Sequence, residues 1–303
     1  MGDSRRYAIL EDRGTLAVGG EDRVTFLQGL VSNDVTKAGP GRAVYAAFLT
    51  PQGKYLHDFF IFDHAGEFLL DCERARLADL MKRLSIYKLR AKVTVADRSD
   101  AFRVAALIGA GWRSGLDLGD KPGDAAAFAG GVVAVDPRLA EAGGRAVVPK
   151  NSTEAALTAA GFARTDAAEY DRLRLSLGLP DGSRDLVADK SILLESGFDE
   201  LNGVDWQKGC YMGQELTART KYRGLVKKRL MPVTFAGPPP ASGTPVMLDG
   251  REAGETRSGV KTPEGGLGLA LMRLDALEGG AEGKAFTAAD VPLKVVKPAW
   301  AAF

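Results

Sequence analysis

The residue types most able to do chemistry gather in one short segment near position 210. Its members are Lys208, Gly209, Cys210, Tyr211, Met212, Gly213, Gln214 and Glu215. Glycines on both sides of the thiol permit a tight turn or the close approach of a ligand. A thiol that follows a cation, or that lies at a helix N-terminus, has a lowered pKa and exists partly as the reactive thiolate. The segment predicts thiol chemistry at Cys210, and the alternative is a small buried cysteine that only packs.

The ligand types in the chain argue against a resident metal. It has two cysteines, Cys72 and Cys210, and two histidines, His57 and His64. An iron-sulfur cluster held within one chain normally takes four thiolate or imidazole ligands, and the paired spacings typical of zinc sites do not occur in the sequence. We therefore predict that the chain alone binds no cluster and no metal. We interpret both cysteines as thiols in a reducing compartment.

Charge and hydropathy limit the partners of the chain. Forty basic and 39 acidic residues leave a formal charge of +1, so no field of the whole molecule attracts nucleic acid or an anionic membrane. No segment approaches the roughly 18 apolar residues of a membrane span, and the first residues do not form an apolar leader. The sequence predicts a cytoplasmic protein that makes no direct contact with nucleic acid or membrane.

The elements that must position these residues are of mixed type. Residues 43–49 and 55–62 are β-rich runs on either side of a turn with Pro and Gly, which predicts a hairpin. The second run carries His57 and Asp58, whose side chains alternate to opposite faces of the strand. Apolar residues recur at helical spacing from residue 74 onward. A hairpin followed by a helix and a strand is typical of α+β construction.

The second half of the chain has different sequence patterns from the first half. Residues 115–131, rich in Gly, Asp and Ala, are expected to form a loop. Beyond residue 229, short strands alternate with Gly and Pro turns, which predicts a small all-β barrel or sandwich. We therefore predict an α+β region over residues 1–228, with two interleaved subdomains split near 40 and 100, and a barrel over residues 229–303.

A longer pattern around the cysteine is specific. The string Lys-Gly-Cys-Tyr-x-Gly-Gln-Glu, within residues 195–220, closely resembles the signature of the YgfZ family. Further similar strings lie at residues 26–34, 223–229 and 266–270, so the resemblance extends over nearly the whole chain. The strings at residues 184–186 and 193–196 are most similar to a subgroup of mitochondrial and related bacterial assembly factors.

The resemblance implies a fold and a function. The fold is that of the glycine cleavage T-protein, an aminomethyltransferase, with small domains around a central cavity and a C-terminal β-barrel. The implied ligand is tetrahydrofolate or a one-carbon derivative. The implied role is the assembly or repair of iron-sulfur proteins, including clients that modify tRNA, so the partners are folate and iron-sulfur client or assembly proteins.

The resemblance also selects folate contacts. Glu195 is expected to accept hydrogen bonds from the pterin edge, because a carboxylate can take two N–H donors at once; the alternative is an exposed glutamate. Asp58 resembles an acidic residue near the reacting folate nitrogens, where it can steady a cationic intermediate; the alternative is a salt-bridged strand residue. The remaining expected contacts are Arg90, Arg219 and Arg223, for a folate glutamate tail or for an acidic protein surface, and Trp206 for stacking on the pterin. Ordinary surface or core roles are the alternatives.

Three functions remain open at this point. The first is a folate-dependent accessory factor that uses Cys210. The second is a one-carbon transferase of the T-protein type, although such transferases lack the Lys-Gly-Cys-Tyr string and tend to have Gly-Arg-Glu where this chain has Gly213-Gln214-Glu215. The third is a scaffold without folate, in which Cys210 is buried and inert.

Overall fold

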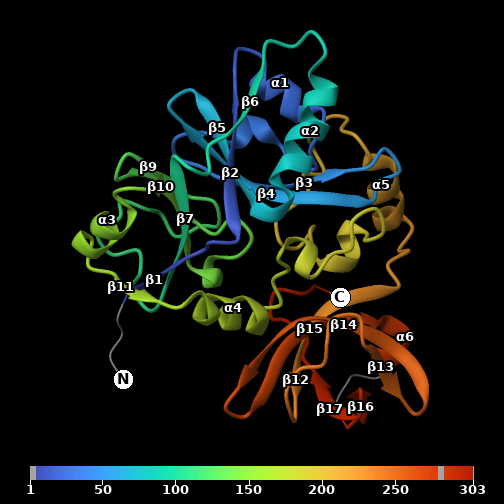
Figure 1. Ribbon diagram of the computed structural model, residues 1–303. Helices are drawn as coiled ribbons and strands as arrows, with labels where there is room; N and C mark the ends of the chain where they lie inside the picture. Colours follow the sequence, from blue (N-terminus) through green and yellow to red (C-terminus); the bar gives the residue numbers. More distant parts are fainter. Residues whose placement is uncertain (1–4, 279–282, 303) are drawn as a thin grey trace. The chain divides into compact units, whose positions relative to one another are not determined.

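The chain divides into two compact units, which are described separately. The structure is a computed structural model that describes residues 5–278 and 283–302 (Figure 1). Unit 1 comprises Met1–Pro51, Leu56–Tyr170 and Leu201–Met212, and unit 2 comprises Gln52–Tyr55, Asp171–Glu200 and Gly213–Phe303. The predicted domain limits at residues 228 and 229 stay a prediction.

The first sheet of unit 1 has the strand order β3-β4-β5-β2-β6. Its strands are β2 Arg13–Gly19, β3 Val44–Leu49, β4 Tyr55–His64, β5 Glu67–Glu73 and β6 Thr94–Asp97. The helices α1 Arg23–Gln28 and α2 Leu77–Lys88 pack on it through Leu27, Leu80 and Leu84. The predicted hairpin and the helix after it are confirmed.

The second sheet of unit 1 has the order β11-β1-β7-β10-β9-β8. Its strands are β1 Arg6–Ile9, β7 Phe102–Ile108, β8 Ala125–Phe128, β9 Gly131–Val135, β10 Gly144–Pro149 and β11 Ala163–Thr165. The helices α3 Thr153–Ala159 and α4 Ala167–Ser176 follow. The expectation of a loop over residues 115–131 is wrong at its end, because β8 pairs with β9 through a tight turn.

A buried network of charges joins these two sheets within unit 1. Its members, each no more than 6% exposed, are Arg13, Asp71, Asp136, Arg138 and Arg145. Arg145 on β10 forms an ion pair with Asp71 on β5, which also accepts a hydrogen bond from Arg13 Nε at 2.6 Å. The Arg145 guanidinium lies 3.9 Å from the centre of the Phe60 ring. Because buried charges need partners, this network fixes how the two sheets meet.

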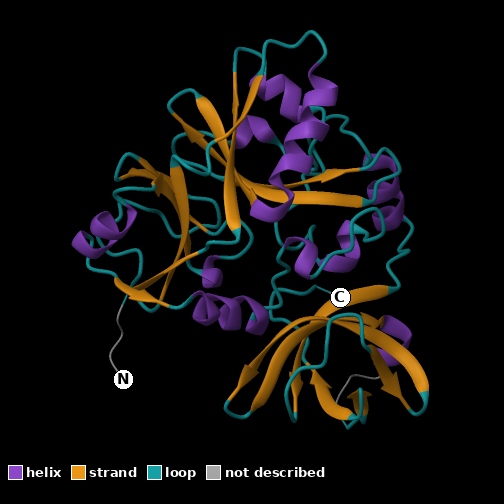
Figure 2. Cartoon of the chain, in the orientation of Figure 1, coloured by secondary structure: helices purple, strands orange, loops and turns teal. Residues whose placement is uncertain are grey.

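Unit 2 contains a closed barrel of the order β12-β15-β14-β13-β16-β17 (Figure 2). Its strands are β12 Lys228–Phe235, β13 Pro245–Leu248, β14 Arg251–Thr262, β15 Gly265–Arg273, β16 Phe286–Ala288 and β17 Val291–Val295. Buried Val233, Val246 and Phe286 belong to its core. Closure leaves no unpaired strand edge, and it confirms the predicted barrel.

Shorter elements complete the described chain. The remaining helices are α5 Gln214–Tyr222 and α6 Leu274–Leu277, and the 3-10 helices are η1 Val35–Lys37, η2 Arg74–Arg76, η3 Ala140–Ala142, η4 Gly182–Arg184 and η5 Leu193–Ser196. In the part of the chain that the structure describes, every helix is too short or too polar to span a membrane.

Candidate functional site

The segment that carries Cys210 is tied to unit 1 by the side chain of Lys208. The Nζ atom of Lys208 donates hydrogen bonds to the carbonyl oxygens of Val31 at 2.6 Å and Asn33 at 2.7 Å. The backbone N–H of Met212 donates to the carbonyl of Gly29 at 3.0 Å. The cation of this motif therefore holds the backbone in place.

The Ser-Asn-Asp string near the start of the chain is the other half of this attachment. Ser32 Oγ donates to the carbonyl of Gly203 at 2.6 Å, and Asn33 Nδ2 donates to the carbonyl of Asn202 at 2.6 Å. The N–H of Asp205 donates to the carbonyl of Ser32 at 3.1 Å. No role for this string was predicted from the sequence. The string is one of the segments that resemble the family pattern, and this was the signal that could have drawn attention to it.

Asp205 shapes the turn that leads to the thiol. Its Oδ1 accepts hydrogen bonds from the N–H groups of Gln207 at 2.7 Å and Lys208 at 3.0 Å, and its Oδ2 pairs with Lys37. Burial acts to raise the pKa of Asp205, but the hydrogen bonds from Lys37 and Gln207 outweigh it and leave the pKa below its ordinary value. Asp205 therefore stays ionised at neutral pH.

Burial changes the titration of Lys208 itself. Desolvation lowers its pKa to about 8, although the charges of Asp34 and Asp205 act in the opposite direction. The Nζ atom also lies 5.1 Å from the centre of the buried Tyr211 ring. The ammonium group is thus enclosed by carbonyl oxygens, two carboxylates nearby and one aromatic face.

The two cysteines lie in opposite environments. Cys210 is exposed, whereas Cys72 on β5 is buried and its Sγ donates to the carbonyl of Gly14 at 3.7 Å. Burial raises the pKa of Cys72 to about 12, which makes it inert as a nucleophile. The exposure of Cys210 contradicts the buried alternative. It does not lie at a helix N-terminus, because α5 begins at Gln214, after Gly213 with a φ of 82°.

Asp58 and His57 face opposite sides of β4, as strand alternation predicts. Asp58 is 4% exposed, and its Oδ2 accepts a hydrogen bond from the Tyr45 hydroxyl at 2.9 Å. His57 Nε2 lies 2.9 Å from Asp79 Oδ2 on α2. Burial, together with the charge of Arg76, lowers the pKa of His57 to about 4. His57 is therefore neutral at pH 7 and serves as a packing residue.

Glu195 is a half-buried carboxylate in η5 of unit 2. Burial raises its pKa, and the positive charges of Lys228, Lys54 and Arg229 oppose this rise. Arg229 of β12 anchors η5 through a hydrogen bond to the Leu194 carbonyl at 2.9 Å. Among residues 5–278 and 283–302, no group forms a hydrogen bond or an ion pair with the Glu195 carboxylate. Because the carboxylate is only partly buried, its oxygens can accept hydrogen bonds from water or from a bound molecule.

The remaining predicted contacts lie in separate places. Arg219 forms an ion pair with Glu215 one turn earlier on α5, at 2.7 Å, and Arg223 is exposed where α5 ends. Arg90 is exposed after α2, and Trp206 is partly buried in unit 1. The structure therefore brings together Lys208 and Tyr211 around the segment that carries Cys210, and it gives Arg219 a partner within its own helix.

Comparisons with known proteins establish the family. Residues 10–117 match the model of the GCVT N-terminal domain, and residues 227–303 match that of the CAF17 C-terminal beta-barrel domain. The mitochondrial iron-sulfur cluster assembly factor IBA57 of Mus musculus is 35% identical over 311 residues, which cover 96% of this chain and 84% of that protein. The Homo sapiens protein is 34% identical with the same coverage. The chain belongs to the IBA57 family.

A solved structure shares the fold of this IBA57-family chain. The glycine cleavage system aminomethyltransferase T of Bartonella henselae superposes with a TM-score of 0.79 at 16% identity, over 98% of this chain and 86% of that protein. At this identity the likeness shows the fold alone. The predicted T-protein-like α+β fold with a C-terminal barrel is confirmed.

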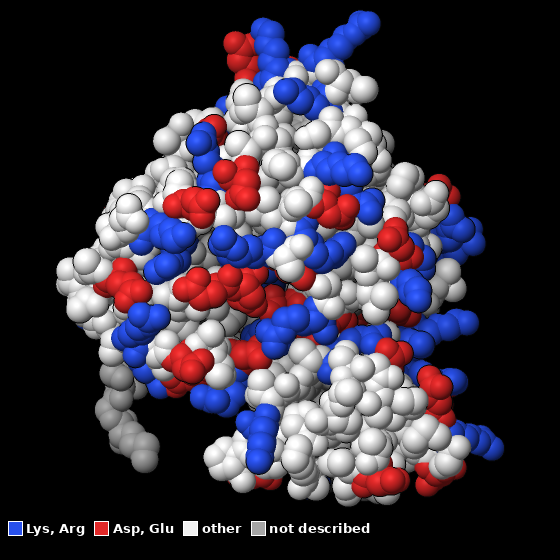
Figure 3. Space-filling model, in the orientation of Figure 1, with Lys and Arg blue, Asp and Glu red and all other residues white. Residues whose placement is uncertain are grey.

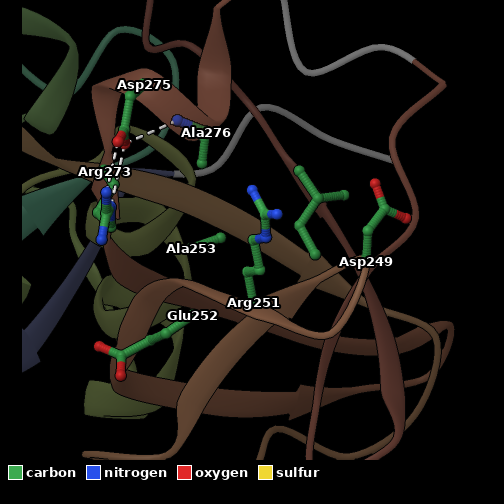
Figure 4. A pocket seen from close by; sticks show the side chains of 8 residues that line it. Asp249, Arg251, Glu252, Ala253, Arg273, Asp275 and Ala276 are labelled. Carbon is green, nitrogen blue, oxygen red and sulfur yellow. Dashed lines mark hydrogen bonds and ion pairs between the residues drawn. The ribbon is translucent and has the colours of Figure 1, made fainter.

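The barrel of this IBA57-family chain also carries a hollow of about 590 Å³ that the sequence did not predict (Figure 4). The Arg251 side chain stands in it between Asp249 and the pair of Arg273 and Asp275, whose Nε and Oδ1 atoms are 3.0 Å apart. A second hollow of about 560 Å³ beside it is lined in part by Lys228, whose charge acts on Glu195. In the described chain, no cluster of three His, Cys, Asp or Glu side chains is placed to hold a metal ion.

Proposed function

We propose that this member of the IBA57 family binds tetrahydrofolate, or a one-carbon derivative of it, and supports the assembly or repair of iron-sulfur proteins. The curated relatives are named iron-sulfur cluster assembly factors. Within this role we propose the finer likeness to YgfZ, with clients that include enzymes that modify tRNA. We also keep the cytoplasmic location as a prediction, which cell fractionation tests.

The folate proposal rests on the burial and the hydrogen bonding of the Glu195 carboxylate. Its carboxylate is half-buried and, within the described chain, has no hydrogen-bond donor, while burial raises its pKa. A pterin edge presents adjacent N–H groups that suit such a carboxylate, and the two resulting bonds would offset the cost of desolvation. Folate, when bound, would supply one-carbon chemistry; the part of Glu195 would be to bind and orient it.

The thiol of Cys210 is proposed to act on the iron-sulfur cargo. A thiolate is the ligand that iron-sulfur clusters use, but one cysteine provides a quarter of the usual ligand set. The exposure of Cys210 leaves it open to a second molecule that supplies the other ligands. Transient contact between Cys210 and a cluster held by a client or assembly protein accounts for both the exposure and the single thiol.

A one-carbon transferase is the second candidate, and Asp58 is the observation in its favour. Its carboxylate is almost fully buried and is oriented by the hydrogen bond from Tyr45. A carboxylate held in this way can steady positive charge that develops on a folate amine. The scaffold alternative is less favoured, because it requires a buried Cys210 and the thiol is exposed.

Calorimetric titration with tetrahydrofolate and with its 5,10-methylene form tests the folate proposal. We expect micromolar binding to the wild-type chain and weaker binding, by on the order of tenfold or more, to Glu195→Ala, because charge-assisted hydrogen bonds each contribute about 1.5–3 kcal/mol. Glu264→Ala is the matched control, since Glu264 is an exposed glutamate of the same unit. No binding to the wild type would favour the scaffold, and equal affinity in Glu195→Ala would remove Glu195 from the site.

A further inference from the structure

The turn after α2 has a backbone conformation that its sequence does not favour. The N–H of Ala91 donates to the carbonyl of Lys88 at 2.8 Å, which closes a four-residue turn. Its second residue, Leu89, has φ 41° and ψ −109°. These angles are close to those of the first central position of a type II′ turn, which is normally glycine. A branched side chain at positive φ is strained.

Among the described residues of unit 1, the strained leucine is also the most exposed large apolar side chain. Leu89 is 89% exposed, and its neighbours Ile86 and Tyr87 are 62% and 39% exposed. Glycine at position 89 would relieve the strain and remove apolar surface from water, so no packing within the described part of the chain accounts for a leucine there. Strain combined with exposure is typical of residues kept for an intermolecular contact.

Three cations without an ion-pair partner among the described residues lie close to this turn in the sequence. The tip is defined as Ile86, Tyr87 and Leu89 together with Lys82, Lys88 and Arg90. Within residues 5–278 and 283–302, none of its three cations forms an ion pair, and in Figure 3 Lys and Arg side chains project from the end of unit 1 where α2 ends. Nearby Arg83 and Lys92, by contrast, are paired with Asp79 and Glu21. The uncompensated charge of the tip is positive.

We infer that this tip docks an acidic protein partner, whose apolar pocket receives Leu89 and Ile86 and whose carboxylates pair with Lys82 and Lys88. The inference rests on the proposed function, because an assembly factor must contact other proteins. An apolar centre with a charged rim is the usual anatomy of such an interface.

Other occupants fit the tip less well. Leu77, Leu80 and Leu84 of α2 are buried in the core of unit 1, and Met81 packs against this core partly buried. One exposed turn is much smaller than the continuous apolar face of a helix that lies on a membrane. A leucine and an isoleucine at the centre also offer neither the base stacking nor the groove contacts that nucleic acid needs.

The test uses the full chain in cells that lack their own copy, with the activity of iron-sulfur enzymes as the readout. Leu89→Gly should keep or raise the melting temperature and keep tetrahydrofolate binding, yet fail to restore these activities. Ala65→Gly is the matched control, since Ala65 is another exposed residue of unit 1 at positive φ, 50°. Lys82→Glu with Lys88→Glu should fail as Leu89→Gly does, whereas Lys121→Glu, at an exposed lysine elsewhere in unit 1, should restore activity.

A photo-crosslinking residue at position 86 provides the direct readout. We expect it to trap an acidic protein that, once purified, binds the wild-type chain at least tenfold more tightly than Leu89→Gly, as for a hot-spot residue. Full activity of Leu89→Gly would overturn the inference. So would trapping of a second copy of this chain. Binding of the wild-type chain to vesicles of phosphatidylglycerol and phosphatidylethanolamine that Leu89→Gly abolishes would also overturn it. If the wild-type chain itself restores no activity, the proposed function fails, and the crosslinking result alone decides the inference.

Discussion

The Nζ atom of Lys208 donates a hydrogen bond to the carbonyl oxygen of Asn33 at 2.7 Å, across 175 positions of the chain. This bond and the second one, to the carbonyl of Val31, attach the segment with the exposed thiol to the connection between α1 and η1. The lysine that precedes the cysteine therefore holds the backbone in place, and its removal should free the segment locally.

We expect Lys208→Met to destabilise the folded chain by about 1–3 kcal/mol, because two partly buried carbonyl groups lose their donor. Urea denaturation measures the loss, and hydrogen exchange should show faster opening over residues 205–212. Lys150→Met is the control, since Lys150 forms an exposed ion pair at 3.6 Å and such pairs contribute about 0–1 kcal/mol. Equal stability of the two variants would show that Lys208 is not an anchor.

The reactivity of the two thiols should differ sharply. In the native chain, a thiol reagent such as dithiobisnitrobenzoate should modify Cys210 quickly and Cys72 only after unfolding, because burial raises the pKa of Cys72 to about 12. Cys210→Ser should fold normally, lose the fast phase and fail to support iron-sulfur enzymes in cells. A fast phase that survives in Cys210→Ser would mean that Cys72 is accessible.

Acid should destabilise the chain through His57. Its folded pKa of about 4 lies below the unfolded value of 6.5, so the unfolded state binds more protons between these values and stability falls as the pH falls through this window. The loss approaches roughly 2–4 kcal/mol. Denaturation of His57→Gln from pH 7 to pH 4 should show a shallower decline than the wild type, and parallel declines would contradict this role of His57.

The buried charge network should be sensitive to the loss of one partner. Asp71 is fully buried and neutralises Arg13 and Arg145. Asp71→Asn should cost about 3–5 kcal/mol, because Arg13 and Arg145 lose the buried carboxylate that they share. Asp117→Asn, at an exposed aspartate of the same unit, is the control and should cost less than about 0.5 kcal/mol. A similar melting temperature for both variants would mean that solvent reaches the network.

Local patterns predicted the elements well where turns separate them clearly. The hairpin of β3 and β4 and the strands of the barrel other than β16 follow from β-branched and aromatic runs between Gly and Pro turns. Strand β8 was missed because its four residues, Ala125–Phe128, are mostly alanine and have little β-propensity of their own. The strand forms because its backbone pairs with that of β9, despite this low β-propensity.

Contacts between residues far apart in the sequence could not be predicted from local sequence patterns. The bond from Ser32 to Gly203 joins residues 171 positions apart, and no local pattern reports such a pairing. The cluster of Arg13, Arg138 and Arg145 around Phe60 was also missed, because arginine side chains are mostly exposed in proteins. The thiol segment was found because its residue types are unusual at short spacing. Its anchoring was not, because it depends on the fold.

The contrast between Cys72 and Cys210 restricts how this chain can respond to oxidants. Cys72 is held in the core of unit 1, so the native chain cannot close a disulfide with itself. An oxidised Cys210 must instead be resolved by a thiol from another molecule, whether glutathione or a protein. The disulfide that results from oxidation of Cys210 is therefore a mixed disulfide with another molecule. The surrounding thiols determine how long this mixed disulfide persists.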